Sequence, residues 1–185
     1  MISKINKLLF IFPIILISFY YSIYQFEGQS AVDGGLVLSE LVKFPNNFSN
    51  VTSIFYNGWT ILHQFTFLLL KLNFSADFIS TLLIFIVTIF YTLGIYFLVL
   101  GFNHSKTTAL ILSLIVIISR ENFGEVDYPV LYFSEHTYGT FSLSTFTLIT
   151  GLLSNKNFKS AGFFSALLFA SHMVVGLWVI LLLFA

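Results

Sequence analysis

The groups that could do chemistry gather in two polar segments of an otherwise apolar chain. The first segment, residues 25–45, holds Glu27, Asp33 and Glu40. This segment and a second one, residues 120–136, could together supply a general base, oxygen ligands for a divalent cation and a cation that binds phosphate. The alternative interpretation is that loops outside a membrane are simply where charges are tolerated. The second segment, residues 120–136, holds Arg120, Glu121, Glu125, Asp127, Glu135 and His136.

The overall composition indicates an integral membrane protein. The 185 residues are 57% hydrophobic and 9% charged, with a mean hydropathy of +0.93, whereas about a quarter of the residues in soluble domains are charged. The formal net charge is zero, and without a basic cluster we expect no nucleic-acid partner. Because the chain has no cysteine, disulfides, thiolate metal sites and cysteine nucleophiles are excluded.

The apolar runs predict an all-α fold, a polytopic membrane helical bundle. A spanning helix needs about 20 residues, and the segment 107–119 is short for this, so it requires tilt, thinning of the bilayer or burial in protein. The sequence ends inside an apolar run, so we interpret residues 1–185 as a single transmembrane domain, the N-terminal portion of a longer protein. The spans are expected at 7–24, 77–100, 107–119, 137–153 and 160–185, the last as one long helix or two broken ones.

Residues 25–75 are expected to form a long outer loop that contains an amphipathic helix lying on the membrane. Between 51 and 70, polar side chains recur at helical spacing, with either His63 or Gln64 among them, and large apolar residues fall on other faces. Such a pattern is typical of an interfacial helix. His63 and Gln64 are candidates for an acceptor groove or for an ordinary wet face. A second, short helix is expected near 36–43.

The distribution of lysine predicts the orientation. If 51–70 lies on the membrane, all eight acidic residues fall outside, and the N-terminus is cytoplasmic under the positive-inside rule. We therefore expect a multi-pass protein of a bacterial inner or plasma membrane. The lysines placed in the cytoplasm by this layout are Lys4, Lys7, Lys106, Lys156 and Lys159.

Two other features suggest how the helices pack. Gly162, Ala166 and Ala170 repeat every four residues, a small-residue face that lets another helix approach closely. The hydroxyls of span 137–153 are expected to bond backbone or neighbouring helices. His172 falls at a possible helix break, which favours packing or helix capping over an intramembrane functional role.

Three stretches resemble the GT-C superfamily of membrane glycosyltransferases. An outer Asp after the first span leads to "YNGWTILHQFTFLLLKLNFSADFISTLL", the start of that fold. "IYFLVLGFNHSKTTALILSLIVIISRENFGE" resembles its span, cytoplasmic turn and outer "SR" region, and "NKNFKSAGFFSALLFASHMVVGLWVILLL" resembles its later helix pair. The likeness extends over nearly the whole chain.

This resemblance implies transfer of a sugar from a polyprenyl-phosphate carrier to an unidentified acceptor at the outer face of the membrane. Asp33 stands where the family keeps its catalytic acid and would take the proton of the acceptor hydroxyl. Arg120 and His136 are candidates for the donor phosphate, and His63 for substrate binding. The family often has paired acids, whereas Asp33 has no acidic neighbour, so a divalent cation is compatible but not required. Candidates for a second acid are Glu121, Glu125 and Asp127.

Two other classes of protein remain open at this stage. One is a polymerase or flippase-like partner in a polysaccharide pathway, and the other is a non-catalytic membrane subunit or transporter component. A transporter should place ionisable residues near the middle of the membrane, and only His172 qualifies.

Overall fold

The computed structural model describes residues 2–24, 35–36, 38–39, 41, 60–118 and 138–184. Within these ranges the chain forms seven helices and no strand, which confirms the all-α class. The helices begin and end close to the predicted ranges, and the last apolar run is divided into two. They are α1 (Ile2–Tyr24), α4 (Ile61–Lys71), α5 (Ala76–Gly101), α6 (Lys106–Ile118), α7 (Tyr138–Ser154), α8 (Phe158–Ser171) and α9 (Met173–Phe184).

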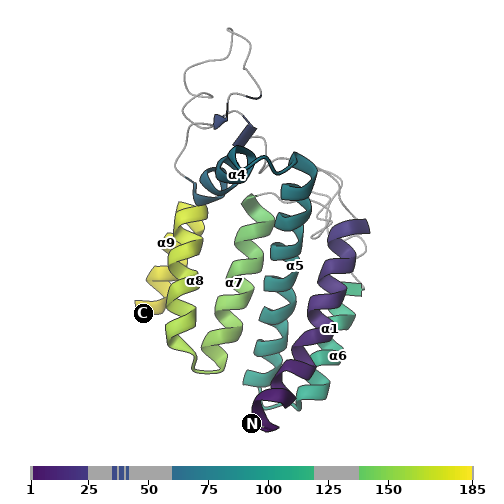
Figure 1. The fold of residues 1–185 in the computed structure, drawn as a ribbon. Coiled ribbons are helices and arrows are strands. Elements are labelled where there is room, and N and C mark those ends of the chain that lie inside the picture. Colours follow the sequence, from purple (N-terminus) through teal and green to yellow (C-terminus); the bar gives the residue numbers. More distant parts are fainter. Residues whose placement is uncertain are drawn as a thin grey trace, which may run out of the picture.

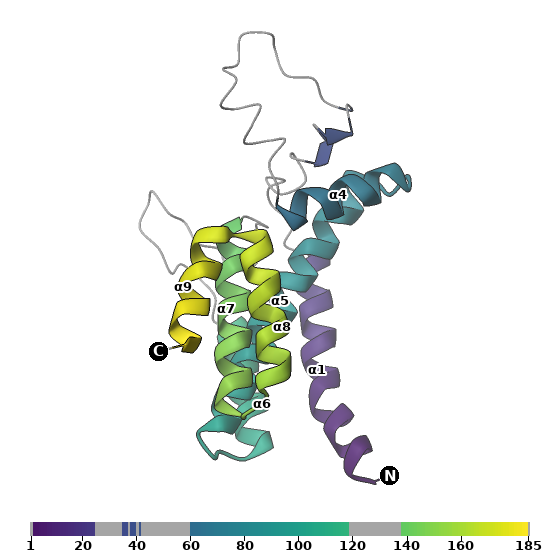
Figure 2. The same ribbon diagram turned by 90° about the vertical axis from the view of Figure 1, so that its left-hand side faces the viewer.

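Helices α1, α5, α6, α7 and α8 run along roughly the same direction, and α4 crosses one end of them (Figures 1 and 2). From the N-terminus, α1 and α6 run toward this α4 end, whereas α5 and α7 run away from it. Helix α8 returns to the α4 end, and α9 folds back beside it. The opposite end carries the N-terminus and the turns that hold Lys106, Lys156 and Lys159, and we call it the basic end.

Three helices end in the same way, through a residue with positive φ. Asn73, Asn103 and Lys156 have φ of 64°, 63° and 59°. After α4, the Asn73 N–H donates to Leu70 O and the Phe74 N–H donates to Leu69 O, which is the pattern of a Schellman motif. Asparagine tolerates this left-handed conformation better than most residues, so two of these turns follow from local sequence. The turn at Asn73 joins α4 to α5, which runs along the bundle. The turns at Asn103 and Lys156 form the hairpins α5–α6 and α7–α8.

Helix α5 is the central element because it packs against α1, α6 and α7. Its approach to α7 is the closest: a Cβ added to Gly94 would lie 2.6 Å from the carbonyl carbon of Thr147, and one added to Gly151 would meet the Gly94 carbonyl oxygen. Only glycine permits such backbone contact. The sequence pattern had indicated another face, Gly162 with Ala166 and Ala170, and this prediction is wrong within the described bundle. Those residues are exposed, and nothing lies within 4 Å of a Cβ on Gly162.

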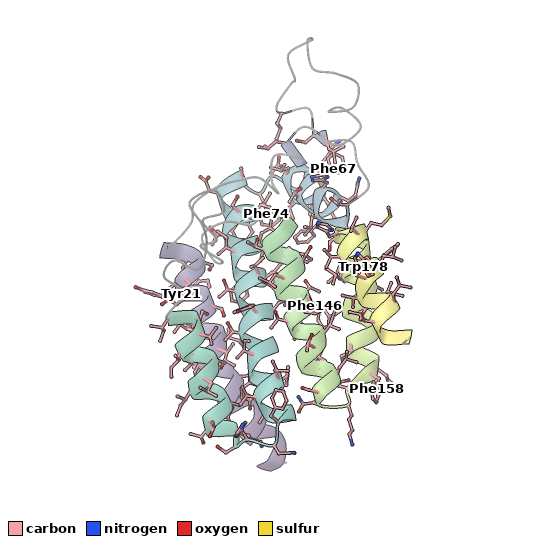
Figure 3. The ribbon with its side chains drawn as sticks, turned by 180° about the vertical axis from the view of Figure 1, so that it is seen from behind. Tyr21, Phe67, Phe74, Phe146, Phe158 and Trp178 are labelled. Carbon is pink, nitrogen blue, oxygen red and sulfur yellow. The ribbon has the colours of Figure 1, made fainter. Side chains whose placement is uncertain are left out.

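The buried faces of α1 and α6 carry hydroxyls where a soluble protein would carry large apolar side chains. The buried stripe of α1 is Ile14, Ser18 and Ser22, and its outward residues include Phe12 and Leu16. In α6, the interior positions are Ala109, Ser113 and Ile117, while the exposed positions include Ile111 and Ile115. Large apolar side chains on the outer surface include Phe146, Phe158 and Trp178 (Figure 3). The outside of the described bundle is therefore at least as apolar as its inside.

Among the described helices, α5 alone is both long and apolar enough to cross a membrane by length and composition. The others contribute apolar segments of 10–17 residues, which in α1 is the stretch Phe10–Ile23. The prediction of an all-helical bundle is thus confirmed, and a polytopic arrangement in a membrane belongs to the proposals below.

Candidate functional site

One of the predicted site residues belongs to the described part of the chain, and the others do not. His63 is described, on α4. Tyr24 is the described residue before the first polar segment, and the described residues within that segment are 35–36, 38–39 and 41. The described residues nearest to the second segment are Ile118 and Tyr138. Six residues lie outside the described ones: the base candidate Asp33, the phosphate candidates Arg120 and His136, and the second-acid candidates Glu121, Glu125 and Asp127.

Helix α4 carries His63, the one predicted site residue that is described, and its ends are specified by local sequence. Thr60 has an extended backbone, and its side-chain oxygen accepts a hydrogen bond of 3.4 Å from the His63 N–H, as an N-cap residue does. The helix ends at Lys71, whose ammonium lies 5.2 Å from the centroid of the Phe67 ring. The predicted amphipathic helix therefore exists over 61–71, the second half of its expected range.

The faces of α4 differ from the predicted ones. The buried residues of α4 are Leu62, His63, Thr66 and Leu70, and the exposed side includes Gln64. His63 is 2% exposed, so it belongs to the packed face and not to an open wet face. The sequence left His63 and Gln64 as equivalent candidates because both fit the polar spacing, and burial separates them. A substrate role for His63 stays a prediction.

The short segment after Asp33 packs directly on α4. A Cβ added to Gly35 would lie 2.7 Å from Cβ of Thr66 and 2.9 Å from the backbone nitrogen of Phe67. Beyond Gly35, the Ser39 N–H donates to Gly35 O at 2.9 Å, and the Leu41 N–H donates to Leu36 O at 3.1 Å. This helical turn agrees with the short helix expected near 36–43. The close approach explains why a glycine stands at position 35.

A cavity of about 190 Å³ lies beneath α4 and is lined only by apolar residues. Phe90 forms part of its wall, with its ring centroid 6.1 Å from that of Phe141. The residues that line it come from α4, α5, α7 and α8, and they are Ile61, Leu62, Phe65, Leu83, Ile86, Phe90, Phe141 and Leu167. Sequence reasoning missed this cavity, because no periodicity shows where four helices leave space between them.

His172 and two hydroxyls of α7 have structural roles. His172 ends α8, where its N–H donates to Leu168 O at 2.8 Å, and its Nδ1 accepts from the Val175 N–H at 3.5 Å. The preference for helix capping at His172 is confirmed. The hydroxyls of Ser144 and Thr145 on α7 donate to carbonyls of their own helix, as expected for structural hydroxyls. Within the described residues, no group of three or more His, Asp or Glu side chains is arranged to hold a metal ion.

Comparisons with known proteins identify no relative. No protein-family model matches the chain, and neither the curated proteins nor the solved structures contain one similar to it. Function is therefore argued from the geometry and from the sequence resemblance alone.

Proposed function

We propose that the protein is an integral membrane glycosyltransferase that moves a sugar from a polyprenyl-phosphate carrier to an acceptor at the outer face of the cytoplasmic membrane. The contact between Gly35 and α4 supports this function most directly, because α4 also forms one wall of the apolar cavity. Asp33 is two residues before Gly35 in the sequence. Since two residues span at most about 7 Å, the chain limits how far this carboxylate can be from α4.

The polarity of the bundle supports a membrane location. In α1 and α6, serines are on the inside, and isoleucine, leucine and phenylalanine are on the outside. Soluble monomers rarely expose large apolar patches. The most apolar stretch of α5 is 39% buried, whereas the core helix of a soluble protein would be mostly buried. A bilayer would cover the surface that these helices leave exposed.

The ends of the bundle support the orientation. Lys106, Lys156 and Lys159 belong to the end that carries the N-terminus (Figure 1). The positive-inside rule favours a cytoplasmic location for that end. The α4 end, with the contact at Gly35 and the cavity, would then face outward.

The cavity beneath α4 suits part of a prenyl chain. A dry cavity of about 150 Å³ holds one benzene molecule, so a volume of about 190 Å³ has room for roughly one or two isoprene units. Its walls offer no polar group to a phosphate. The sugar phosphate would therefore lie outside the cavity, on the side of α4 where the carboxylates are expected.

In the proposed reaction, an acceptor hydroxyl attacks the anomeric carbon of the donor and its proton passes to the Asp33 carboxylate. The bond between the anomeric carbon and the phosphate oxygen breaks, and polyprenyl phosphate leaves. Arg120 and His136 would hold the phosphate, because guanidinium and imidazolium groups donate to its oxygens. A second acid from among Glu121, Glu125 and Asp127 would orient the acceptor, or hold a divalent cation if one takes part.

Transfer of radiolabelled sugar from polyprenyl phosphate by the purified protein, with and without Asp33→Asn, tests this function. We expect the variant to lose transfer, since an amide cannot accept the proton. Asp77→Asn makes the same change at an exposed carboxylate in the first turn of α5; it is the matched control and should keep activity. Equal transfer by Asp33→Asn and the unaltered protein would remove Asp33 as the base.

A substitution that fills the cavity beneath α4 tests whether this cavity holds the lipid chain of the donor. Leu167→Trp fills the cavity beneath α4, whereas Phe163→Trp changes an exposed position of the same helix. We expect Leu167→Trp to raise KM for the lipid-linked donor and Phe163→Trp to leave it unchanged.

Two non-catalytic alternatives, a transporter component and a structural subunit, can be distinguished from a glycosyltransferase. A transporter component should hold ionisable groups within its spanning helices. The lysines and the one carboxylate of the described residues lie at helix ends or in turns, His172 caps a helix, and the buried His63 lies on α4, which crosses the end of the bundle. A structural subunit would show no transfer activity and no sensitivity to Asp33→Asn.

A further inference from the structure

A second cavity, of about 310 Å³, lies at the basic end, away from α4. Helices α1, α5, α6 and α7 and the α7–α8 turn contribute to its walls. Most of its lining is apolar, but Lys106 and Asn157 bring an ammonium and an amide to it. Its apolar walls include Ile11, Phe97, Leu100 and Leu152, and Asn155 lines it beside Asn157.

The amide of Asn157 has donors to offer to a ligand. Its Oδ1 accepts from the Ser160 N–H at 3.4 Å as the N-cap of α8, which leaves the two N–H groups of Nδ2 outside the cap. The neighbouring Asn155 differs, because its Nδ2 already donates to Phe97 O and, at 2.8 Å, to Gly151 O. Asn155 therefore fastens the α7–α8 turn to α5, and Asn157 is the amide donor for a ligand.

The Lys106 ammonium has no carboxylate near it among the described residues. The one acidic residue described is Asp77, in the first turn of α5. Helix α5 has 26 residues and is therefore about 39 Å long, and Lys106 follows its other end. Lys156 and Lys159 are exposed at the same end as Lys106. The combined field of these lysines attracts an anion.

We propose that this cavity binds the headgroup of an anionic glycerophospholipid from the cytoplasmic leaflet. Lys106 Nζ and Asn157 Nδ2 would donate to the phosphodiester oxygens, and the first part of an acyl chain would lie along Ile11 and Leu152. The apolar walls favour a lipid over a free phosphate ion. This site is separate from the proposed donor site, because it is at the opposite end of the bundle.

The surroundings of the cavity suit a membrane interface. Phe102, in the α5–α6 turn, is 68% exposed, and Phe158, at the start of α8, is 66% exposed (Figure 3). Apolar rings beside lysines match the region where acyl chains meet headgroups. Anionic lipids of the cytoplasmic leaflet are attracted by about 1 kcal/mol per basic residue near the surface, so the site combines general attraction with a shaped cavity.

Native mass spectrometry of the full chain tests the proposal by counting retained lipids. The protein is exchanged into mixed micelles that contain phosphatidylglycerol or phosphatidylcholine with identical acyl chains. We expect preferential retention of phosphatidylglycerol, and Lys106→Ala should lower its retention about fivefold. Lys159→Ala removes an exposed lysine of the same end that does not line the cavity, so it weakens only the general attraction and should lower retention less than Lys106→Ala does.

A second variant separates lipid binding from folding. Asn157→Asp keeps a side-chain oxygen for the cap of α8 but places a negative charge at the cavity. We expect it to reduce retention of phosphatidylglycerol and to leave thermal stability in detergent unchanged. Equal loss in Lys106→Ala and Lys159→Ala, or equal retention of the two lipids, would overturn the proposal. Displacement of phosphatidylglycerol by millimolar inorganic phosphate would instead identify a free-phosphate site. None of these readouts depends on glycosyl transfer.

Discussion

Gly35 and Thr66 touch so closely that a Cβ on Gly35 would lie 2.7 Å from Cβ of Thr66. These residues are 31 positions apart in the sequence, and their contact fixes the segment after Asp33 against α4. The Thr66 hydroxyl, which donates to His63 O at 3.0 Å, lies on the same side, because a Cβ on Gly35 would also meet Thr66 Oγ1. The turn at 35–41 therefore has little freedom to move over α4 without loss of this contact.

Gly35→Ala should separate the turn from α4 and lower sugar transfer. The added methyl group meets a side chain and a backbone nitrogen of a helix, and such overpacking costs about 1–3 kcal/mol. A displacement of about 1 Å at a catalytic group can lower a rate by roughly 100-fold. Ser39→Ala removes a hydrogen bond within the same turn and is the matched control. Full activity in Gly35→Ala would show that the contact does not position the proposed base.

Gly94→Ala should destabilise the bundle, and Gly162→Ala should not. At Gly94 the new Cβ meets the backbone of α7, which cannot yield without moving a helix, so we expect a loss of about 1–3 kcal/mol. At Gly162 there is open space, and replacing glycine by alanine within a helix gains up to about 1 kcal/mol. Thermal unfolding in detergent measures both. A loss of stability in Gly162→Ala would indicate that the small-residue face of α8 packs against something outside the described residues.

His63→Ala should reduce stability more than Gln64→Ala. The imidazole is 2% exposed, and truncation of a buried large side chain commonly costs about 2–5 kcal/mol, whereas exposed Gln64 should contribute less than about 0.5 kcal/mol. Unfolding midpoints and KM for the donor, measured together, separate packing from substrate contact. A raised KM with unchanged stability would assign His63 to the substrate instead of the packed face.

The sequence predicted which residues form helices better than which faces of the helices pack. Long apolar runs, with Asn73 and Asn103 in the turns, are local features, so the helix bounds were close. In a chain this apolar, however, the buried and the exposed face of a helix are both apolar, so the hydrophobic periodicity does not identify the buried face. That is why the spacing of small residues indicated the Gly162 face and gave no sign of the contact at Gly94, and why His63 and Gln64 were not distinguished. The cavities depend on how four or five helices diverge, which no local pattern encodes.

The chain offers a direct test of membrane orientation because it has no native cysteine. Lys71→Cys at the end of α4 and Lys159→Cys in the first turn of α8 place single thiols at exposed positions of opposite ends. In intact cells, an impermeant maleimide should label Lys71→Cys at once and Lys159→Cys only after permeabilisation. Labelling of both from outside would contradict the proposed orientation.

Thr88 provides the last prediction, since its buried Oγ1 has no hydrogen-bond partner among the described residues. Thr92, one turn later, differs because its hydroxyl donates to Thr88 O at 2.7 Å. Leaving a buried hydroxyl unpaired costs about 1–3 kcal/mol, so Thr88→Val, which keeps the shape, should hold or raise the unfolding temperature, while Thr92→Val should lower it. A lower unfolding temperature for Thr88→Val would mean that a water molecule or another group bonds the Thr88 hydroxyl and makes it part of a polar network inside the bundle.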